Sequence, residues 1–427
     1  MNVPDSRYSW VRLAICTLIS TIGGVGMWSF VVALPAVQAD FGIARGEASL
    51  PYTLLMTGFA LGSIATGRLA DRFGIRVTLV FGAIAVGLGF LGAGAASQLW
   101  QLTAAYALLG LGTSAGFGPL IADISHWFER WRGIAVGICS AGNYLAGALW
   151  PPVISYFMAG SGWRATHVGI GIFCIVTLLP LALLLRRKML FAHSAGGALQ
   201  HSSSLGLSPT ALQVLLSIAG VACCVAMSMP QVHIVAYCGD LGYGVARGAE
   251  MLSLMMAFGI VSRVGSGFIA DRVGGLRTLL LGSALQGVAL ALYALFDGLT
   301  SLYVISALFG LFQGGIVPSY AIIVREYFSP REAATRLGII LMATLFGMAV
   351  GGWMSGLIFD LTGSYRAAFL NGIAWNALNV AIALWLIARP RRLAMVTALL
   401  GLACLFRFLE ACARFRKTPS PRRRGPA

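Results

Sequence analysis

Gly67-Arg68-Leu69-Ala70-Asp71-Arg72-Phe73-Gly74, followed by Arg76, is a polar stretch between two long apolar segments. It recurs late in the chain as Gly267-Phe268-Ile269-Ala270-Asp271-Arg272-Val273-Gly274, followed by Arg277. Both copies combine small residues with an Asp-Arg pair. Small residues let two membrane helices approach closely, whereas the charged pair is costly inside a membrane. The two copies therefore predict equivalent turns between membrane spans.

The motif is part of a longer internal repeat, because other short stretches recur at nearly the same offset. A parallel repeat of six spans, with its axis along the membrane normal, is the architecture of two-domain secondary transporters. We therefore expect an all-α polytopic membrane protein with twelve helices in two pseudo-symmetric six-helix halves. The repeated stretches are Asp40-Phe41-Gly42 with Asp240-Leu241-Gly242, Ala44-Arg45-Gly46 with Ala246-Arg247-Gly248, Gly110 and Pro119 with Gly310 and Pro318, Trp127-Phe128 with Tyr327-Phe328, and Trp163-Arg164-Ala165 with Tyr365-Arg366-Ala367.

Composition excludes a water-soluble enzyme. Of the 427 residues, 58% are hydrophobic and only 10% are charged, and the mean hydropathy is +0.84. A soluble domain carries about 25% charged residues. The net charge of +16 is typical of nucleic-acid binders, but those are rich in Lys, and this chain has only Lys188 and Lys417. A membrane protein whose charges lie in short loops accounts for both properties.

Twelve apolar stretches reach the roughly 20 residues that a membrane helix needs. The polar segment 187–210 reads as a cytoplasmic linker between the halves 1–186 and 211–388, and 389–427 forms a basic tail. The predicted spans are 11–37, 48–70, 77–97, 99–125, 133–158, 163–185, 211–238, 248–270, 278–297, 300–324, 333–358 and 367–388.

Positive charge predicts the orientation. With the N-terminus inside, the inside loops of residues 1–388 hold fifteen Lys or Arg residues. The outside loops hold four, namely Arg45, Arg164, Arg247 and Arg366. This excess follows the positive-inside rule. We therefore expect a multi-pass protein of a bacterial inner membrane with both termini in the cytoplasm.

The repeated motif resembles the signature loop of the major facilitator superfamily, G-x-L-a-D-r-x-G-r, and both copies are in register. Its Asp can face a helix N-terminus or a basic group of the other half, and its Arg side chains can pair across the cytoplasmic seam. Such contacts would form when the inner gate shuts and break when it opens. The alternative is that these arginines only set the topology. The predicted gate residues are Gly67, Asp71, Arg72, Gly74, Arg76, Asp271 and Arg272.

Three patches resemble the monocarboxylate porter branch and its bacterial organic-anion relatives. Residues 4–11, PDSRYSWV, resemble the entry signature P-D-G-G-W-G-W-V with both glycines replaced. Residues 127–137, WFERWRGIAVG, resemble the entry to span 5. The third is Arg263, eight residues before Asp271, which stands where the branch places its substrate-anchoring Arg. Span 7 also looks similar to the branch through Pro230 and His233.

Arg263 is the best clue to the cargo, independently of the resemblance. It is the only basic residue deep inside a predicted span, about 12 Å from the cytoplasmic end of its helix at 1.5 Å per residue. A charge at that depth costs roughly 2.5–3.5 kcal/mol and should face a cavity or a partner. No acidic residue occupies the middle of a predicted span. An anionic substrate is then the natural counter-ion, since a guanidinium binds a carboxylate through a bidentate fork. The alternative is a structural Arg bonded to backbone carbonyls.

Proton coupling does not carry over directly from the resemblance. The branch has an Asp one turn before this Arg and a Lys in the middle of span 1. Here the first position is Gly259, and the second falls in Met27-Trp28-Ser29-Phe30. His233 is a candidate substitute, because its charge changes near physiological pH. The alternative is a neutral, hydrogen-bonding His packed against span 1.

Other polar and aromatic residues at mid-span depth are candidates for the substrate cavity. A single polar residue on a membrane helix can instead bond a neighbouring helix. Three acids near span ends are predicted to make helix-end or gate contacts, namely Asp123, Glu326 and Asp360. The cavity candidates are Trp28, Asn143, Gln313, Tyr52 and Tyr320.

Motifs for catalysis or metal binding are missing from the sequence. It contains no HExxH, phosphate loop or intramembrane carboxylate pair. Its 8 Cys residues show neither a CxxC pair nor metal-ligand spacing. Most lie in or beside spans, where thiols behave as small hydrophobic groups. We expect a protein that is not an enzyme and that carries no cofactor and no metal.

The sequence thus predicts a secondary active transporter of a small, monocarboxylate-like organic anion, working by alternating access. His233 is its candidate for proton coupling. The alternatives are a carrier of a neutral metabolite or drug in which Arg263 is structural, and a non-transporting receptor or channel on the same scaffold. We expect it to function as a monomer and to bind no nucleic acid.

The basic tail accounts for much of the net charge. From Arg389 onward it holds ten basic residues and one acid, Glu410, which contributes +9 of the +16. Residues 393–409 are largely apolar and are flanked by basic clusters. An interfacial helix attracted to anionic lipid of the cytoplasmic leaflet fits this pattern. A thirteenth span is the alternative.

Overall fold

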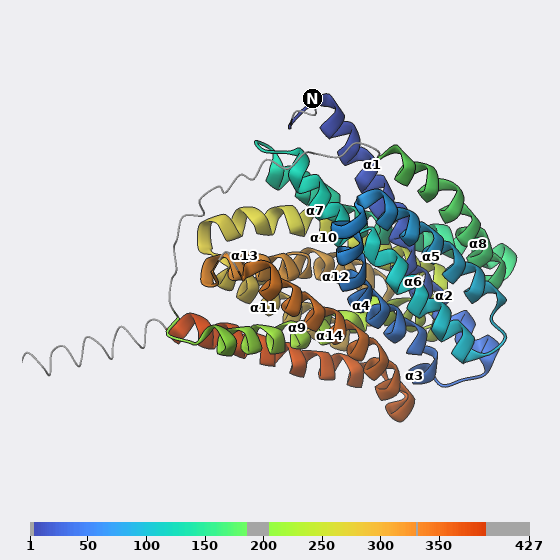
Figure 1. Ribbon diagram of the computed structural model, residues 1–427. Helices are drawn as coiled ribbons and strands as arrows, with labels where there is room; N and C mark the ends of the chain where they lie inside the picture. Colours follow the sequence, from blue (N-terminus) through green and yellow to red (C-terminus); the bar gives the residue numbers. More distant parts are fainter. Residues whose placement is uncertain (1–3, 186–204, 330–331, 390–427) are drawn as a thin grey trace, which may run out of the picture.

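A computed structural model describes residues 4–185, 205–329 and 332–389, and within them every regular element is a helix. Most of the predicted linker 187–210, and the tail beyond Arg389 with its predicted lipid contact, lie outside the described residues. Figure 1 shows two groups of helices, coloured blue to green for the first half and green to red for the second. We call the described residues before and after the predicted linker the first half and the second half.

The first half begins with one long apolar segment, Arg7–Phe41, in which two helices meet at Gly24. Its first helix starts at a side-chain cap, because the hydroxyl of Ser6 accepts a hydrogen bond from the backbone N–H of Ser9. The helices are α1 (Arg7–Gly23), α2 (Val25–Phe41), α3 (Arg45–Ala48), α4 (Leu50–Phe73), α5 (Ile75–Ala95), α6 (Leu99–Ala115), α7 (Gly118–Trp127) and α8 (Arg132–Leu184).

The second half repeats this order after Ser208, whose side chain caps its first helix. Its final helix, Tyr365–Arg389, carries no label in Figure 1. The other helices are α9 (Pro209–Asp240), α10 (Val245–Val273), α11 (Gly275–Leu295), α12 (Leu299–Gln313), α13 (Ile316–Tyr327) and α14 (Ala333–Thr362).

Eleven described helices or helix pairs are long and apolar enough to cross a membrane. One of them, α8, contains 53 residues and is broken at Gly162, whose φ of 75° lies in the left-handed region that favours glycine. A straight helix of that length would measure about 80 Å, against a hydrocarbon core of about 30 Å. The arms 132–161 and 163–184 match two of the twelve predicted spans.

The internal repeat is visible in the packing. A Cβ on Gly110 of α6 would lie 2.0 Å from the carbonyl oxygen of Leu55 on α4. In the second half, a Cβ on Gly310 of α12 would lie 2.0 Å from the carbonyl oxygen of Met255 on α10. Only glycine permits this backbone approach. The repeated glycines therefore join equivalent helix pairs in the two halves.

The halves meet along a seam formed by α2 with α9, α3 and α4 with α14, and α8 with α10. Helix α4 runs from near Arg45 to Asp71, so these two residues mark its opposite ends. We call them the Arg45 end and the Asp71 end of the seam. In Figure 1 the N-terminus and α3 likewise lie at opposite ends of the molecule.

Candidate substrate site and gates

At the Arg45 end, one guanidinium joins the two halves. Arg45 donates to both carboxylate oxygens of Asp240, at 2.5 and 3.2 Å, and to the hydroxyl of Tyr365 at 2.5 Å. Its Nε donates to Gln38 of its own half at 2.7 Å. The guanidinium also lies 4.6 Å from the ring centre of Phe359. Only 6% of Arg45 is exposed, whereas the Asp240 side chain is 37% exposed, so the ion pair is shielded from water on the Arg45 side.

A second carboxylate crosses the seam at the same end. Asp360 accepts hydrogen bonds from the backbone N–H groups of Arg45 and Gly46, at 2.8 and 2.6 Å. These N–H groups begin α3 and have no partner inside that helix. Asp360 therefore makes the predicted helix-end contact, and it does so across the seam.

His233 continues this network into the second half. Its Nε2 lies 2.8 Å from the carbonyl oxygen of Gly352, and its Nδ1 lies 3.3 Å from the hydroxyl of Tyr365. A carbonyl only accepts, so Nε2 carries a hydrogen, and a neutral imidazole would then accept at Nδ1 from the hydroxyl of Tyr365. Tyr52 packs beside it, because a Cβ on Gly352 would lie 2.9 Å from the Tyr52 ring.

Arg263 lies on the seam between α8 and α10. Its guanidinium carbon is 4.0 Å from the ring centre of Tyr144, which belongs to the other half. Its Nε is buried without a hydrogen-bond partner. No carboxylate in the described ranges pairs with it. A desolvated cation–π contact contributes about 2 kcal/mol, less than the roughly 2.5–3.5 kcal/mol that a charge costs at mid-membrane. The contact with Tyr144 therefore offsets only part of the cost of placing the Arg263 charge in the membrane.

Trp28 and Asn143 lie beside this contact. The indole Nε1 of Trp28 donates to the backbone carbonyl of Asn143 at 3.3 Å. A Cβ on Gly147 would lie 2.8 Å from the Trp28 ring and 2.6 Å from Met256 of α10. The side-chain oxygen of Asn143 is buried without a partner. The structure thus brings Trp28, Asn143 and Arg263 to neighbouring positions on α2, α8 and α10.

Gln313 and Tyr320 form their contacts inside the second half. The side-chain oxygen of Gln313 accepts from Gln231 at 2.8 Å, and the hydroxyl of Tyr320 donates to the sulfur of Cys223 at 3.6 Å. Both partners lie on α9. These are the helix-to-helix contacts that the sequence offered as the alternative to ligand binding. The substrate-binding roles predicted for seven residues stay predictions, namely those of Arg263, His233, Asn143, Trp28, Gln313, Tyr52 and Tyr320.

The Asp71 end differs sharply from the Arg45 end. Asp71, Arg72, Asp271 and Arg272 are all exposed. In the part of the chain that the structure describes, none of these four side chains makes a hydrogen bond or an ion pair. The side chain of Arg72 lies over its neighbour Phe73, 5.2 Å from the ring centre. The predicted pairing across this seam is not made here, and the gate assignment stays a prediction.

Two of the three patches that resemble the porter branch touch each other. A carboxylate oxygen of Asp5 accepts from the backbone N–H of Arg130 at 3.0 Å, and the Asp5 N–H donates to Trp127 at 3.1 Å. Further along α1, Arg12 donates to both oxygens of Asp123, at 2.8 and 2.9 Å, and lies 4.5 Å from the Trp127 ring centre. Arg12 is 1% exposed, so it is not a loop charge. The N-terminal segment is thereby fixed to the end of α7.

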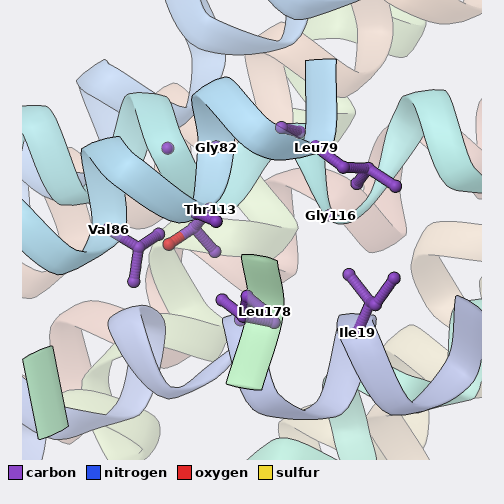
Figure 2. A pocket seen from close by; sticks show the side chains of 11 residues that line it. Ile19, Leu79, Gly82, Val86, Thr113, Gly116 and Leu178 are labelled. Carbon is purple, nitrogen blue, oxygen red and sulfur yellow. The ribbon is translucent and has the colours of Figure 1, made fainter. Parts of the chain in front are cut away.

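A small apolar pocket lies inside the first half, between α1, α5, α6 and α8 (Figure 2). Ile19 and Leu178 lie across it from Leu79 and Val86, and Thr113 is the one polar side chain among its lining residues. It offers no cation, so it cannot balance an anion. We therefore place the candidate site at Arg263 rather than in this pocket.

Sequence reasoning did not identify Arg45 as a cross-seam residue, because it counted Arg45 with the outside loop charges. The repeat marks Arg45 and Arg247 equally, yet Arg247 is exposed and pairs with Glu250 of its own helix at 3.1 Å. Asp40, the counterpart of Asp240, pairs with Arg164 of its own half. Identical positions in the repeat therefore have different partners, and no sequence signal separates them.

Comparisons with known proteins give a family and a fold. The chain matches the Major Facilitator Superfamily over residues 16–304 and 266–402. It is 28% identical over 378 residues to monocarboxylate transporter 13 of Bos taurus, covering 86% of each chain. To monocarboxylate transporter 11 of Homo sapiens it is 26% identical over 385 residues, which is 86% of this chain and 80% of the relative.

Solved transporters share the fold at low sequence identity. The nucleoside transporter NupG superposes with a TM-score of 0.70 at 14% identity, covering 89% of this chain and 99% of that one. A bacterial homologue of the human lysosomal transporter Spinster, in an inward-facing and occupied conformation, superposes with a TM-score of 0.67 at 18% identity, covering 91% and 98%.

Proposed function

Since the chain belongs to the Major Facilitator Superfamily, we propose that it carries a small organic anion of the monocarboxylate type across the membrane by alternating access. The chain is a multi-pass membrane transporter and not an enzyme. The relatives named monocarboxylate transporters support this choice of cargo, and each matches over most of its length. The substrate class itself rests on one residue.

The observation that carries the proposal is the charge of Arg263. Its guanidinium lies on the seam between the halves, over the face of Tyr144, and no described carboxylate neutralises it. The N–H groups of a guanidinium point outward in its plane, so a contact to its face leaves its edge free. A carboxylate can bind that edge through two parallel hydrogen bonds. The substrate thus supplies the counter-charge that the protein does not.

Uptake by proteoliposomes tests this proposal. Wild type and Arg263→Gln would be compared with radiolabelled acetate, lactate and pyruvate, beside the neutral amide of each acid. We expect wild type to accumulate at least one acid and to discriminate against its amide, and Arg263→Gln to lose most of that uptake. Equal uptake by the two proteins would overturn the anchoring role of Arg263.

The two ends of the seam support a working cycle. Arg45 and Asp360 hold the halves together at one end, while the charged motifs at the Asp71 end are exposed. With the N-terminus in the cytoplasm, as the charge distribution predicts, this arrangement is closed outside and open inside. Protons are coupled through His233, which shares Tyr365 with Arg45. In the opposite state the Arg45 contacts break and the motif contacts form.

A second candidate function follows from the same contact. The ring of Tyr144 gives Arg263 a partner within the protein, and a structural Arg is compatible with a neutral metabolite or drug as cargo. In that case Arg263→Gln would lower uptake of an acid and its amide by the same factor. Counterflow, in which unlabelled internal substrate accelerates entry of labelled substrate, distinguishes either carrier from a channel or receptor.

A further inference from the structure

Tyr144 faces two residues of the opposite half at once. Its ring centre lies 4.0 Å from the guanidinium carbon of Arg263. One turn earlier on the same helix is Gly259, where a Cβ would lie 2.4 Å from Cε1 and 2.6 Å from Cδ1 of Tyr144. Real Cβ atoms do not approach other atoms so closely. The ring thus occupies the volume that any side chain at position 259 would need.

We propose that Tyr144 is the positioning residue of the substrate-anchoring Arg263, and that Gly259 is the residue that admits its ring. This inference rests on the proposed function, because it assumes that Arg263 binds the anion. The ring attracts the guanidinium to its face. The edge of the guanidinium, which is the part that matches a carboxylate, stays directed away from the ring.

The chemistry of the partner determines what the site can bind. A carboxylate beside Arg263 would neutralise it and compete for its N–H groups. An aromatic ring has no formal charge and no acceptor lone pair on its face, so Arg263 keeps both its positive charge and its donors. The ring belongs to the first half and Arg263 to the second, so the anchor is oriented only where α8 and α10 meet. We therefore expect Tyr144 to govern affinity for anions in particular.

Neighbouring contacts hold the ring in place. The residue before Tyr144 is Asn143, whose backbone carbonyl accepts from the indole of Trp28. One turn later, Ser253 of α10 donates to the carbonyl of Ala148 on α8. Tyr144 itself is only 7% exposed. The segment of α8 that carries the ring is thus bonded to both halves.

A double-mutant cycle tests the proposal. The probe is whichever of acetate, lactate and pyruvate the wild type takes up fastest, with its neutral amide measured in parallel. Tyr144→Ala removes the ring, and Gly259→Ala displaces it with a single methyl group. We expect each to raise KM for the acid about ten- to thirtyfold, to change kcat less than threefold, and to leave uptake of the amide unchanged. Because both variants act through one ring, the double variant should be no worse than Tyr144→Ala alone.

Two conservative variants provide matched controls. Tyr144→Phe keeps the aromatic face, so its KM should stay within about twofold of wild type. Gly265→Ala adds a methyl to the same helix where nothing lies within 4 Å, and it should also behave as wild type. All variants are first checked for a single symmetric peak in detergent gel filtration.

The outcomes separate the two claims. A lost acid uptake in Arg263→Gln together with an unchanged KM in Tyr144→Ala overturns the positioning role and leaves the proposed function intact. Additive effects of Tyr144→Ala and Gly259→Ala overturn the role of Gly259. Unchanged acid uptake in Arg263→Gln overturns the proposed function and this inference together.

Discussion

The two ends of the seam both carry Asp and Arg side chains but use them in opposite ways. At the Arg45 end a buried Arg binds a carboxylate of the other half, and a second carboxylate closes over the start of α3. At the Asp71 end both Asp-Arg pairs are exposed and unbonded within the described residues. A buried ion pair contributes only when its partners are fully hydrogen-bonded, and Arg45 meets that condition. Among the residues that the structure describes, charged groups therefore hold the two halves together at the Arg45 end and not at the Asp71 end.

Sequence symmetry between the halves does not imply symmetric bonding. Asp40 and Asp240 are equivalent in the repeat, yet Asp40 bonds Arg164 within its half and Asp240 bonds Arg45 across the seam. Two halves related by a parallel repeat present different surfaces to each other. Substitutions at the two ends should therefore have unequal effects on uptake. We expect the largest loss at Arg45 and the smallest at the exposed Asp-Arg motifs.

Removing Arg45 should have the largest effect. Breaking one partner of a fully buried pair costs about 3–5 kcal/mol. The cost here should lie below that range, because the Asp240 side chain is 37% exposed, but it would still shift the population away from the state closed at this end. We expect Arg45→Ala to lower uptake about a hundredfold. In an Arg45→Ala background, a cysteine at the fully buried Ser49 should become reactive towards a membrane-impermeant thiol reagent.

Arg247→Ala is the matched control, because Arg247 is the repeat counterpart of Arg45 and is exposed. It should change uptake less than twofold. Similar losses of uptake in Arg45→Ala and Arg247→Ala would show that the contact across the seam is not what makes Arg45 important.

Neutralising Asp240 should lower uptake more than neutralising Asp40, its equivalent in the first half. Asp240→Asn leaves the buried Arg45 without its counter-charge and should lower uptake by at least about tenfold. The side chains of Asp40 and Asp240 are 38% and 37% exposed, so the two pairs differ in their Arg partners. The Arg164 side chain is 40% exposed and that of Arg45 only 7%. Asp40→Asn therefore breaks an ion pair that is exposed on both sides. Such pairs contribute about 0–1 kcal/mol, so its loss should stay below about fivefold. Initial rates of uptake measure both, and equal losses would contradict the asymmetry.

Replacing His233 tests whether the Arg45 network responds to protons. His233→Gln removes the imidazole that bonds Tyr365, so uptake should lose its pH dependence while substrate exchange continues. His167→Gln is the control, since His167 is equally buried but bonds Tyr106 and Trp163 inside its own half. Exchange and net uptake measured across a pH series compare them. A pH dependence that survives in His233→Gln would exclude this residue as the proton site.

The smallest effect on stability is expected at the Asp71 end. Asp71→Asn and Asp271→Asn change exposed, unbonded side chains, so the free energy of unfolding should change by less than about 0.5 kcal/mol. Uptake should nevertheless fall severalfold, because the motif is predicted to close the opposite state. Thermal unfolding in detergent and uptake are measured on the same preparations. A loss of stability with normal uptake would contradict the gate role of Asp71 and Asp271 and indicate a structural role instead.

Much of the fold could be predicted from the sequence, because membrane spans depend on local composition. The predicted spans agree with the helices to within four residues at each end, apart from the joined arms of α8. The glycines Gly110 and Gly310 mark the repeat correctly, because close backbone contact requires glycine at both places. Arg263 is unusual by its depth alone, since charge inside a span is costly wherever it points.

The contacts between helices could not be predicted in the same way. Tyr144 is a buried aromatic residue among many, and only its position over Arg263 and Gly259 distinguishes it. Gln313 and Tyr320 are reasonable cavity candidates by depth, but their bonds go to α9. Depth in the membrane follows from position along the chain, whereas the direction of a side chain around its helix depends on how neighbouring helices pack.

Hydropathy and the offset of the motifs are properties of the chain, and they are enough to specify a helical membrane protein with a repeated half. Which charges meet is a property of the packed molecule. Arg45 and Arg247 occupy the same place in the repeat, yet one is buried against Asp240 and the other is exposed. An ion pair depends on the distance between two side chains, and residues nearly 200 positions apart acquire that distance only when the halves pack together.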